Sequence, residues 1–160
     1  MKAKSVLLFL ALLLGSFSIK AATIQQTIQF SNTTPERLYQ IFMSSQEYSA
    51  FTGETAVIDP REGGETSTFG GLGVGKILKL VPNSLIVQSW RAIRLFKEGE
   101  LDATLILTFR KNEDGAEIEM VQANIPDAHR ATVNTNWNLY YWQPLAKYII
   151  GNPTAPASGK

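Results

Sequence analysis

The chain has 160 residues, of which 15 are Lys or Arg and 14 are Asp or Glu, and it contains no cysteine. This length suits one domain with a substantial core, and the lack of thiols excludes disulfides, thiol nucleophiles and thiolate metal sites. The near balance of charge argues against a binder of nucleic acid or of anionic membranes, which would carry a basic surplus.

The N-terminal residues have the composition of a secretory signal. Lys2 and Lys4 give a positive start, residues 6–14 form an unbroken apolar run, and Ala21 and Ala22 form a small-residue processing site. An uncleaved membrane anchor is the alternative, but the apolar run is well short of the roughly 20 residues that span a bilayer. We therefore predict that residues 1–22 are removed, with no stable membrane insertion afterwards.

Removal of this segment changes the charge and defines the domain. The mature chain would keep 12 basic and 14 acidic residues, because Lys2, Lys4 and Lys20 leave with the signal. Export without cysteines fits a bacterial periplasm, so we predict a periplasmic or secreted protein. One domain is expected over residues 23–150. The small, polar and Pro-rich residues 151–160 are expected to be a disordered tail.

The mature chain begins with one strand and two short helices. Residues 23–31 alternate between apolar and polar side chains, as a half-buried strand does. Thr34 is a suitable cap and Pro35 a suitable first residue for a helix. A second short helix is expected from Ser45 to Phe51, and Gly53 should end it.

The middle of the chain reads as a succession of strands. The predicted strands cover residues 55–58, 65–69, 76–81, 85–93, 103–110 and 117–123. Turn signals such as Gly70-Gly71 and Pro82-Asn83 separate them. These intervals are too short for parallel crossovers, so the sequence predicts an antiparallel sheet.

The last ordered stretch, residues 132–150, predicts a long aromatic helix. Its apolar residues recur at steps of three and four, at Val133, Trp137, Tyr141 and Leu145. Pro144 lies inside this pattern, and we expect it to kink the helix. The fold class is therefore α+β: a curved antiparallel sheet of about six to seven strands, two short helices after the first strand, and a long C-terminal helix packed across the sheet.

In this order, the elements resemble a known family. The resemblance is carried by residues 30–39, where a strand leads into a Pro-Glu helix start, by the Gly-rich residues 63–75, by the strand of residues 82–90 that ends in Trp90, and by the aromatic closing helix. The chain resembles the activator of heat-shock-protein-90 ATPase homologue family, within the START/SRPBCC (helix-grip) superfamily. That resemblance implies a sheet gripping the final helix, a cavity between them, and no universal catalytic residues.

The resemblance places the candidate ligand site between the sheet and the closing helix. We expect Trp90, Trp137 and Tyr141 to line a cavity there, with Arg91 and Arg94 near its mouth. An inward arginine would hold a carboxylate or another anion bidentately. The alternative is that both are surface arginines whose stems cover apolar area.

Other motifs give no support for catalysis, a metal or a cofactor. Residues 70–77 are similar to a phosphate-binding loop, but Ile77 follows Lys76 where Ser or Thr is required. His129 is the only histidine, and Asp127 beside it is expected to cap the last helix. No catalytic residue, metal ligand or cofactor is therefore predicted.

The leading functional prediction is non-catalytic binding of a small apolar or amphipathic molecule. A cyclase- or aromatase-like enzyme using cavity Tyr and Arg is one alternative, and a protein-partner-binding module with a filled core is another. The export signal argues against a chaperone partner, because the activity in the family's name acts on a cytosolic machine.

Overall fold

The computed structural model describes residues 21–153. Most of the predicted signal, residues 1–20, and most of the predicted tail, residues 154–160, lie outside the described part. The elements are β1 (Ala21–Ser31), α1 (Pro35–Met43), α2 (Ser45–Thr52), β2 (Val57–Ile58), β3 (Glu65–Thr68), η1 (Phe69–Gly71), β4 (Gly73–Val81), β5 (Leu85–Ala92), β6 (Ala103–Lys111), β7 (Gly115–Pro126), η2 (Asp127–His129), α3 (Arg130–Trp137), η3 (Asn138–Trp142) and α4 (Gln143–Gly151).

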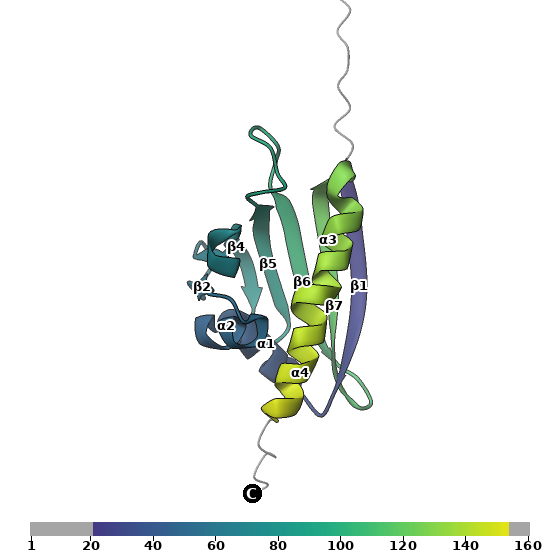
Figure 1. The fold of residues 1–160 in the computed structure, drawn as a ribbon. Helices are drawn as coiled ribbons and strands as arrows, with labels where there is room; N and C mark the ends of the chain where they lie inside the picture. Colours follow the sequence, from purple (N-terminus) through teal and green to yellow (C-terminus); the bar gives the residue numbers. More distant parts are fainter. Residues whose placement is uncertain (1–20, 154–160) are drawn as a thin grey trace, which may run out of the picture.

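The strands form one seven-stranded sheet in the order β1-β7-β6-β5-β4-β3-β2, and every pairing is antiparallel. The closing helix lies across one face of this sheet, and α1 and α2 lie beside its C-terminal end (Figure 1). The predicted α+β helix-grip architecture is confirmed, including the two short helices and the long closing helix.

The short helices begin and end as their sequences predict. The Thr34 side chain accepts a hydrogen bond from the Arg37 backbone N–H at 3.2 Å, and Pro35 occupies the first turn of α1. Gly53 ends α2 in the left-handed conformation, with φ 74°. Arg37 and Glu47 form an ion pair at 2.7 Å that joins the two helices.

The Gly-rich segment is more regular than predicted. Phe69–Gly71 forms a 3-10 turn, and β4 begins at Gly73, so Gly73 and Gly75 lie within a strand rather than in a loop. A Cβ at Gly75 would lie 2.0 Å from the Ser89 carbonyl oxygen on β5. Glycine is needed at Gly75 because the neighbouring backbone approaches closely, and not for loop flexibility.

The closing helix is continuous from α3 through α4, with a π turn, η3, in its middle (Figure 1). Pro144 follows this turn and has no N–H to donate to the Tyr140 carbonyl. The Gln143 N–H bonds to the Asn138 carbonyl, in the wider π pattern. The structure therefore accommodates Pro144 with a π turn, where the sequence predicted a proline kink.

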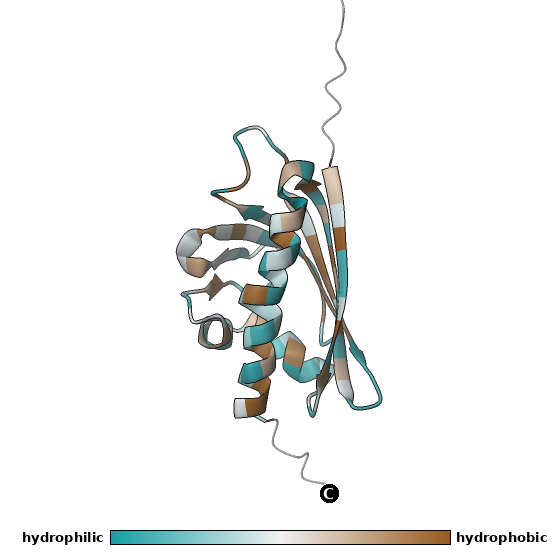
Figure 2. Cartoon of the chain, turned by 45° about the vertical axis from the view of Figure 1, so that its right-hand side comes forward, coloured by the Kyte–Doolittle hydropathy of each residue, from teal (hydrophilic) through white to brown (hydrophobic). Residues whose placement is uncertain are grey.

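The π turn also changes which residues face the sheet. Tyr141 and Trp142 within this turn are both buried. The π turn adds one residue to the turn, so the buried positions before and after it are offset by one residue in the helical pattern. Apolar and polar residues otherwise alternate around the helix, as Figure 2 shows. Within residues 21–153, no helix is long and apolar enough to cross a membrane.

Two tryptophan–glutamine hydrogen bonds join the closing helix to the sheet. Trp137 Nε1 donates to Gln122 Oε1 on β7 at 2.6 Å, in a fully buried position. Trp142 Nε1 donates to the Gln26 side-chain oxygen on β1. These bonds satisfy indole N–H groups that would otherwise be costly to bury, and they set the position of the helix along the strands.

The start of the closing helix differs from the prediction. The segment begins with the 3-10 turn η2, and neither Asp127 nor His129 caps it through its side chain. The expected Asp127 cap is therefore wrong. Pro126, the last residue of β7, leads directly into the turn, so the chain passes from strand to helix without a separate capping residue.

Candidate functional site: a cavity between sheet and closing helix

A cavity of about 350 Å³ lies between the closing helix and the β4–β5 part of the sheet. Residues of α3 and η3 form the helix side of the cavity. Residues of η1, β4, β5 and the β5–β6 loop form its sheet side. The lining residues are Phe69, Leu72, Gly73, Trp90, Ala92, Leu95, Val133, Asn136, Trp137, Tyr140 and Tyr141. This volume lies within the range of about 300–1,000 Å³ typical of small-molecule sites.

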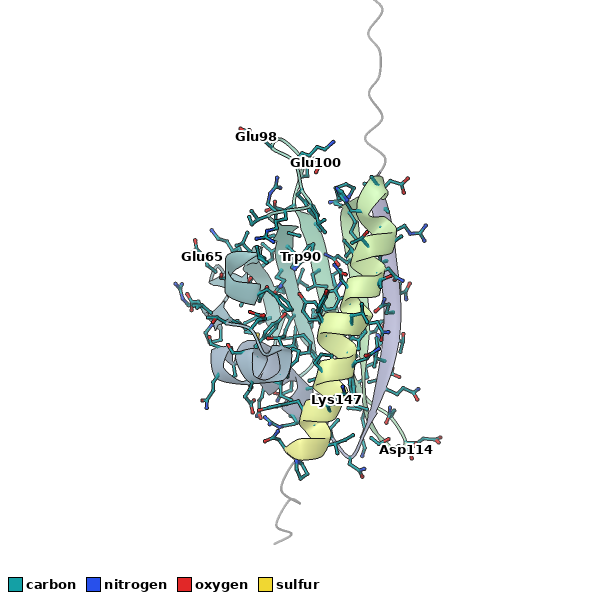
Figure 3. All side chains as sticks on the ribbon, viewed as in Figure 1. Glu65, Trp90, Glu98, Glu100, Asp114 and Lys147 are labelled. Atoms are coloured by element: carbon teal, nitrogen blue, oxygen red, sulfur yellow. The ribbon has the colours of Figure 1, made fainter. Side chains whose placement is uncertain are left out.

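The sheet side leaves space where two of its residues are small. Gly73 and Ala92 are paired across β4 and β5, and both line the cavity. Trp90 lies two residues before Ala92 and therefore faces the same side of β5. Figure 3 labels Trp90 in the middle of the molecule, between the closing helix and the outer strands.

The mouth of the cavity is apolar and open to solvent. Leu72 and Tyr140 stand on opposite sides of it and are 41% and 52% exposed. Tyr140 also packs edge-on against Phe69, with ring centroids 6.1 Å apart. An apolar entrance of this kind favours a guest with apolar surface over a strongly hydrated one.

Tyr141 is the buried hydroxyl of the site. Burial raises the pKa of Tyr141 to about 12, and the nearby Tyr48, Trp90 and Thr68 side chains offset part of that rise. Its hydroxyl is therefore protonated at neutral pH and suited to donating a hydrogen bond. Its ring lies against Trp137, with centroids 4.1 Å apart, so the hydroxyl is held on a rigid aromatic wall.

A second and much smaller void lies behind Trp137. Its volume is about 20 Å³, and Tyr48, Thr66, Thr68 and Gln88 provide its polar surface. That is the size needed to hold one water molecule. Burial raises the pKa of Tyr48 well above its ordinary value, and the neighbouring Tyr141 adds to this. A cluster of polar groups thus lies on the inner side of the cavity.

Of the five predicted ligand-site residues, Trp90, Trp137 and Tyr141 meet around one cavity. Arg91 does not line it, and the expectation of an inward anion-binding Arg91 is wrong. Its guanidinium donates to the carbonyl oxygens of Lys97 and Glu100 and pairs with Asp102 at 2.8 Å. Alternation along β5 turns Arg91 to the face opposite Trp90 and Ala92.

Arg94 does not line the cavity either, because it is exposed in the β5–β6 loop. This loop projects beyond the sheet, and Figure 3 labels Glu98 and Glu100 at its outer end. Arg91 instead holds the base of the loop, and its guanidinium carbon lies 5.5 Å from the Phe96 ring centre. Phe96 in turn packs edge-on against Trp90, with centroids 5.8 Å apart.

Sequence reasoning missed several lining residues. Phe69 and Leu72 belong to the Gly-rich segment, and Leu95 belongs to the β5–β6 loop. An apolar residue inside a predicted loop is a usable signal, because a loop needs no apolar residue for its own structure. Asn136 had no such signal, since it falls just beside the apolar stripe of the closing helix.

Residues 32–149 match the family model described as Activator of Hsp90 ATPase homolog 1-like protein. The chain belongs to this family. Among curated proteins, the human activator of 90 kDa heat shock protein ATPase homolog 1 is 32% identical over 113 residues. That match covers 71% of this chain and 33% of the human protein, so the chain spans about a third of the length of that relative.

Solved structures of this fold agree with the architecture. An HSP90 activator from Plasmodium falciparum superposes with a TM-score of 0.70 at 20% identity, covering 83% of this chain and 97% of that one. The Aha1 dimer from Colwellia psychrerythraea gives a TM-score of 0.69 at 17% identity, covering 82% and 98%. At these identities the likeness establishes the fold and not a shared activity.

Proposed function

We propose that this family member is an exported domain that binds a small apolar or amphipathic molecule in the cavity under the closing helix. The observation that carries the proposal is a cavity of about 350 Å³ whose lining is mostly apolar and aromatic. The cavity lies between the sheet and the closing helix, and a few polar groups lie on its inner side. Such sites bind ligands by burying apolar surface and orient them with those few polar contacts.

Ligand-dependent stabilisation is the direct test. A ligand that binds only the folded protein, present at 100 times its dissociation constant, adds about 2.7 kcal/mol to stability. A thermal-shift screen on delipidated protein should find stabilising apolar compounds, and native mass spectrometry should detect a bound molecule after gentle purification. If no compound shifts the melting temperature and nothing co-purifies, small-molecule binding is wrong.

Export is a separate part of the proposal. It rests on the charged start, apolar run and small-residue site within residues 1–22. Ala22 is buried in β1 and pairs with Ile125, so cleavage before Ala22 would keep this pair and cleavage after it would not. Sequencing the N-terminus of protein from its native host should give Ala22 or Thr23. A retained Met1 in a cytosolic fraction would contradict export.

An enzymatic role of the cyclase or aromatase kind has less support. It would need cavity Tyr and Arg groups acting together, and both candidate arginines lie outside the cavity lining. Tyr141, with a pKa of about 12, is poorly suited to act as a base at neutral pH. We therefore propose binding without catalysis.

Binding of a protein partner is the second candidate, and the family membership favours it. Relatives carry the name activator of 90 kDa heat shock protein ATPase, although this chain covers only about a third of them. Stimulation of the ATPase of a purified Hsp90 by the mature domain would support this function. No stimulation, together with a positive ligand screen, would leave the small-molecule proposal in place.

A further inference from the structure

The cavity described above lacks a charged side chain among its lining residues. Arg91 is held by the carbonyl oxygens of Lys97 and Glu100 and by Asp102, and Arg94 is exposed in the β5–β6 loop. A carboxylate that entered this space would lose its hydration without gaining a cation. Burying an ionised group in this way is strongly unfavourable.

The inner side of the cavity instead offers neutral hydrogen-bond donors. The Trp90 indole N–H and the Tyr141 hydroxyl lie close to each other, and the Tyr48 and Thr68 side chains are also near that hydroxyl. Both residues line the cavity, and Tyr141 is buried. A ligand acceptor placed beside these two donors would gain a hydrogen bond that a hydrocarbon group cannot make, so it would be favoured.

Gly73 keeps the indole N–H of Trp90 accessible. A Cβ at this position would lie 3.7 Å from Trp90 Nε1 and 2.5 Å from Thr68 Oγ1. A side chain at Gly73 would therefore collide with Thr68 Oγ1 and lie in van der Waals contact with the indole nitrogen. Gly73 has no positive φ that would require glycine, so close approach is the reason for glycine here.

We propose that the cavity selects uncharged molecules whose buried end carries a hydrogen-bond acceptor, such as a ketone, ester or amide carbonyl, and discriminates against carboxylates of the same shape. This inference rests on the proposed small-molecule function and names the ligand class. The acceptor would lie between Trp90 Nε1 and the Tyr141 hydroxyl. The apolar body would extend past Leu72 and Tyr140 toward the mouth.

Three probes of nearly equal shape separate the contributions: 2-acetylnaphthalene, 2-ethylnaphthalene and 2-naphthoate at pH 7. Dissociation constants would come from titrations followed by ¹⁵N NMR, which also reports on the Trp90 indole N–H. We expect the ketone to bind about fivefold to tenfold more tightly than the ethyl compound, because of its added hydrogen bond. The carboxylate should bind at least about tenfold more weakly than the ketone.

Each outcome distinguishes this inference from the function on which it rests. If ketone and ethyl compound bind equally, or if 2-naphthoate binds best, the cavity is a ligand site but the inferred selectivity is wrong. If none of the three binds, both the inference and the proposed function are overturned for guests of this size.

Substitution of one tyrosine tests the donor itself. Tyr141→Phe should remove most of the preference for the ketone, while the ethyl compound binds within about twofold of the parent. Tyr140→Phe is the matched control, because it loses the same hydroxyl at the half-exposed mouth and should leave the preference unchanged. A preference that survives in both Tyr141→Phe and Trp90→Phe would overturn the assignment of these two donors.

Discussion

The two halves of the closing helix present similar apolar stripes, yet one covers a cavity and the other a filled core. Around α3 and the first part of η3, the helix faces Gly73 and Ala92, which are too small to reach it. Around α4 and the end of η3, the sheet and the short helices supply large rings instead. Phe42 alone lies within 6.5 Å, between ring centroids, of Tyr48, Phe51, Phe109 and Trp142.

This difference shows that the cavity is determined by the residues opposite the helix. A helix stripe of Trp and Tyr is compatible with either outcome, because aromatic side chains pack a core as readily as they line a site. The small residues on β4 and β5 decide between the two.

Truncation of Trp137 should be the most damaging change, because this residue lines the cavity and also packs against Trp142 in the filled core. It is 2% exposed, stacks on Trp142 with centroids 5.0 Å apart, and bonds to Gln122. Trp137→Ala should lower the free energy of unfolding by about 3–5 kcal/mol. Urea denaturation would measure this, with Leu139→Ala on the exposed side of the same helix as the control. Equal midpoints for the two variants would contradict the packing described here.

Alkaline pH should lower the free energy of unfolding through Tyr141, a buried residue of η3. Because burial raises its pKa from 10.0 to about 12, the folded chain keeps this proton while the unfolded chain loses it. The stabilisation is complete below pH 10 and is lost as the pH rises through about 12. The slope should be about 1.4 kcal/mol per pH unit within that window.

Urea titrations between pH 9 and pH 12 would measure that slope. Tyr141→Phe should reduce it, and what remains should come partly from Tyr48, whose pKa burial also raises. An identical slope in the parent and in Tyr141→Phe would show that the Tyr141 hydroxyl reaches solvent more freely than its burial indicates.

Most of the fold and part of the candidate site could be predicted from the sequence, because these features depend on local patterns. The alternation of residues 23–31, the Thr34-Pro35 helix start and the spacing from Val133 to Leu145 each follow from the geometry of one element. The family resemblance predicts that Trp90, Trp137 and Tyr141 lie at one cavity. These three residues meet at the cavity because β5 and the closing helix face each other.

What could not be predicted depends on partners distant in sequence. The outward direction of Arg91 follows from the phase of β5, and a one-residue change of phase reverses every side chain. The sequence predicts a loop at Gly73, because the role of this glycine is visible only beside Thr68 and Trp90. The π turn before Pro144 offsets the helical pattern by one residue, and the spacing of the apolar residues alone does not predict it.

Enlarging an alanine should destabilise the packed core more than the cavity wall. Ala116 is fully buried in the packed core, so Ala116→Leu should cost about 1–3 kcal/mol through overpacking. Ala92 faces the cavity, so Ala92→Leu should change the free energy of unfolding by less than about 0.5 kcal/mol. The added leucine should occupy part of the cavity and weaken ligand binding. Chemical denaturation of both variants, with a ligand titration of Ala92→Leu, tests the contrast. Equal destabilisation would mean that the cavity cannot accept added volume.

The smallest effect on global stability is expected at Arg91, whose bonds hold the β5–β6 loop and thereby Leu95 at the cavity. Its ion pair with Asp102 is partly exposed, so Arg91→Ala should lower the free energy of unfolding by only about 1 kcal/mol. The local effect should be larger, because the Lys97 and Glu100 carbonyl oxygens lose their donor. Opening of the loop should become easier while the sheet stays closed.

Hydrogen exchange would separate these local and global effects. Amides of residues 93–101 should exchange roughly tenfold faster in Arg91→Ala, whereas amides of β6 and β7 should match the parent. Arg94→Ala is the matched control, since it removes an exposed arginine from the same loop and should leave exchange unchanged. If both variants behave alike, Arg91 does not hold the loop. If only Arg91→Ala loosens it and also weakens ligand binding, the cavity depends on Leu95 being held in place by an arginine that never enters it.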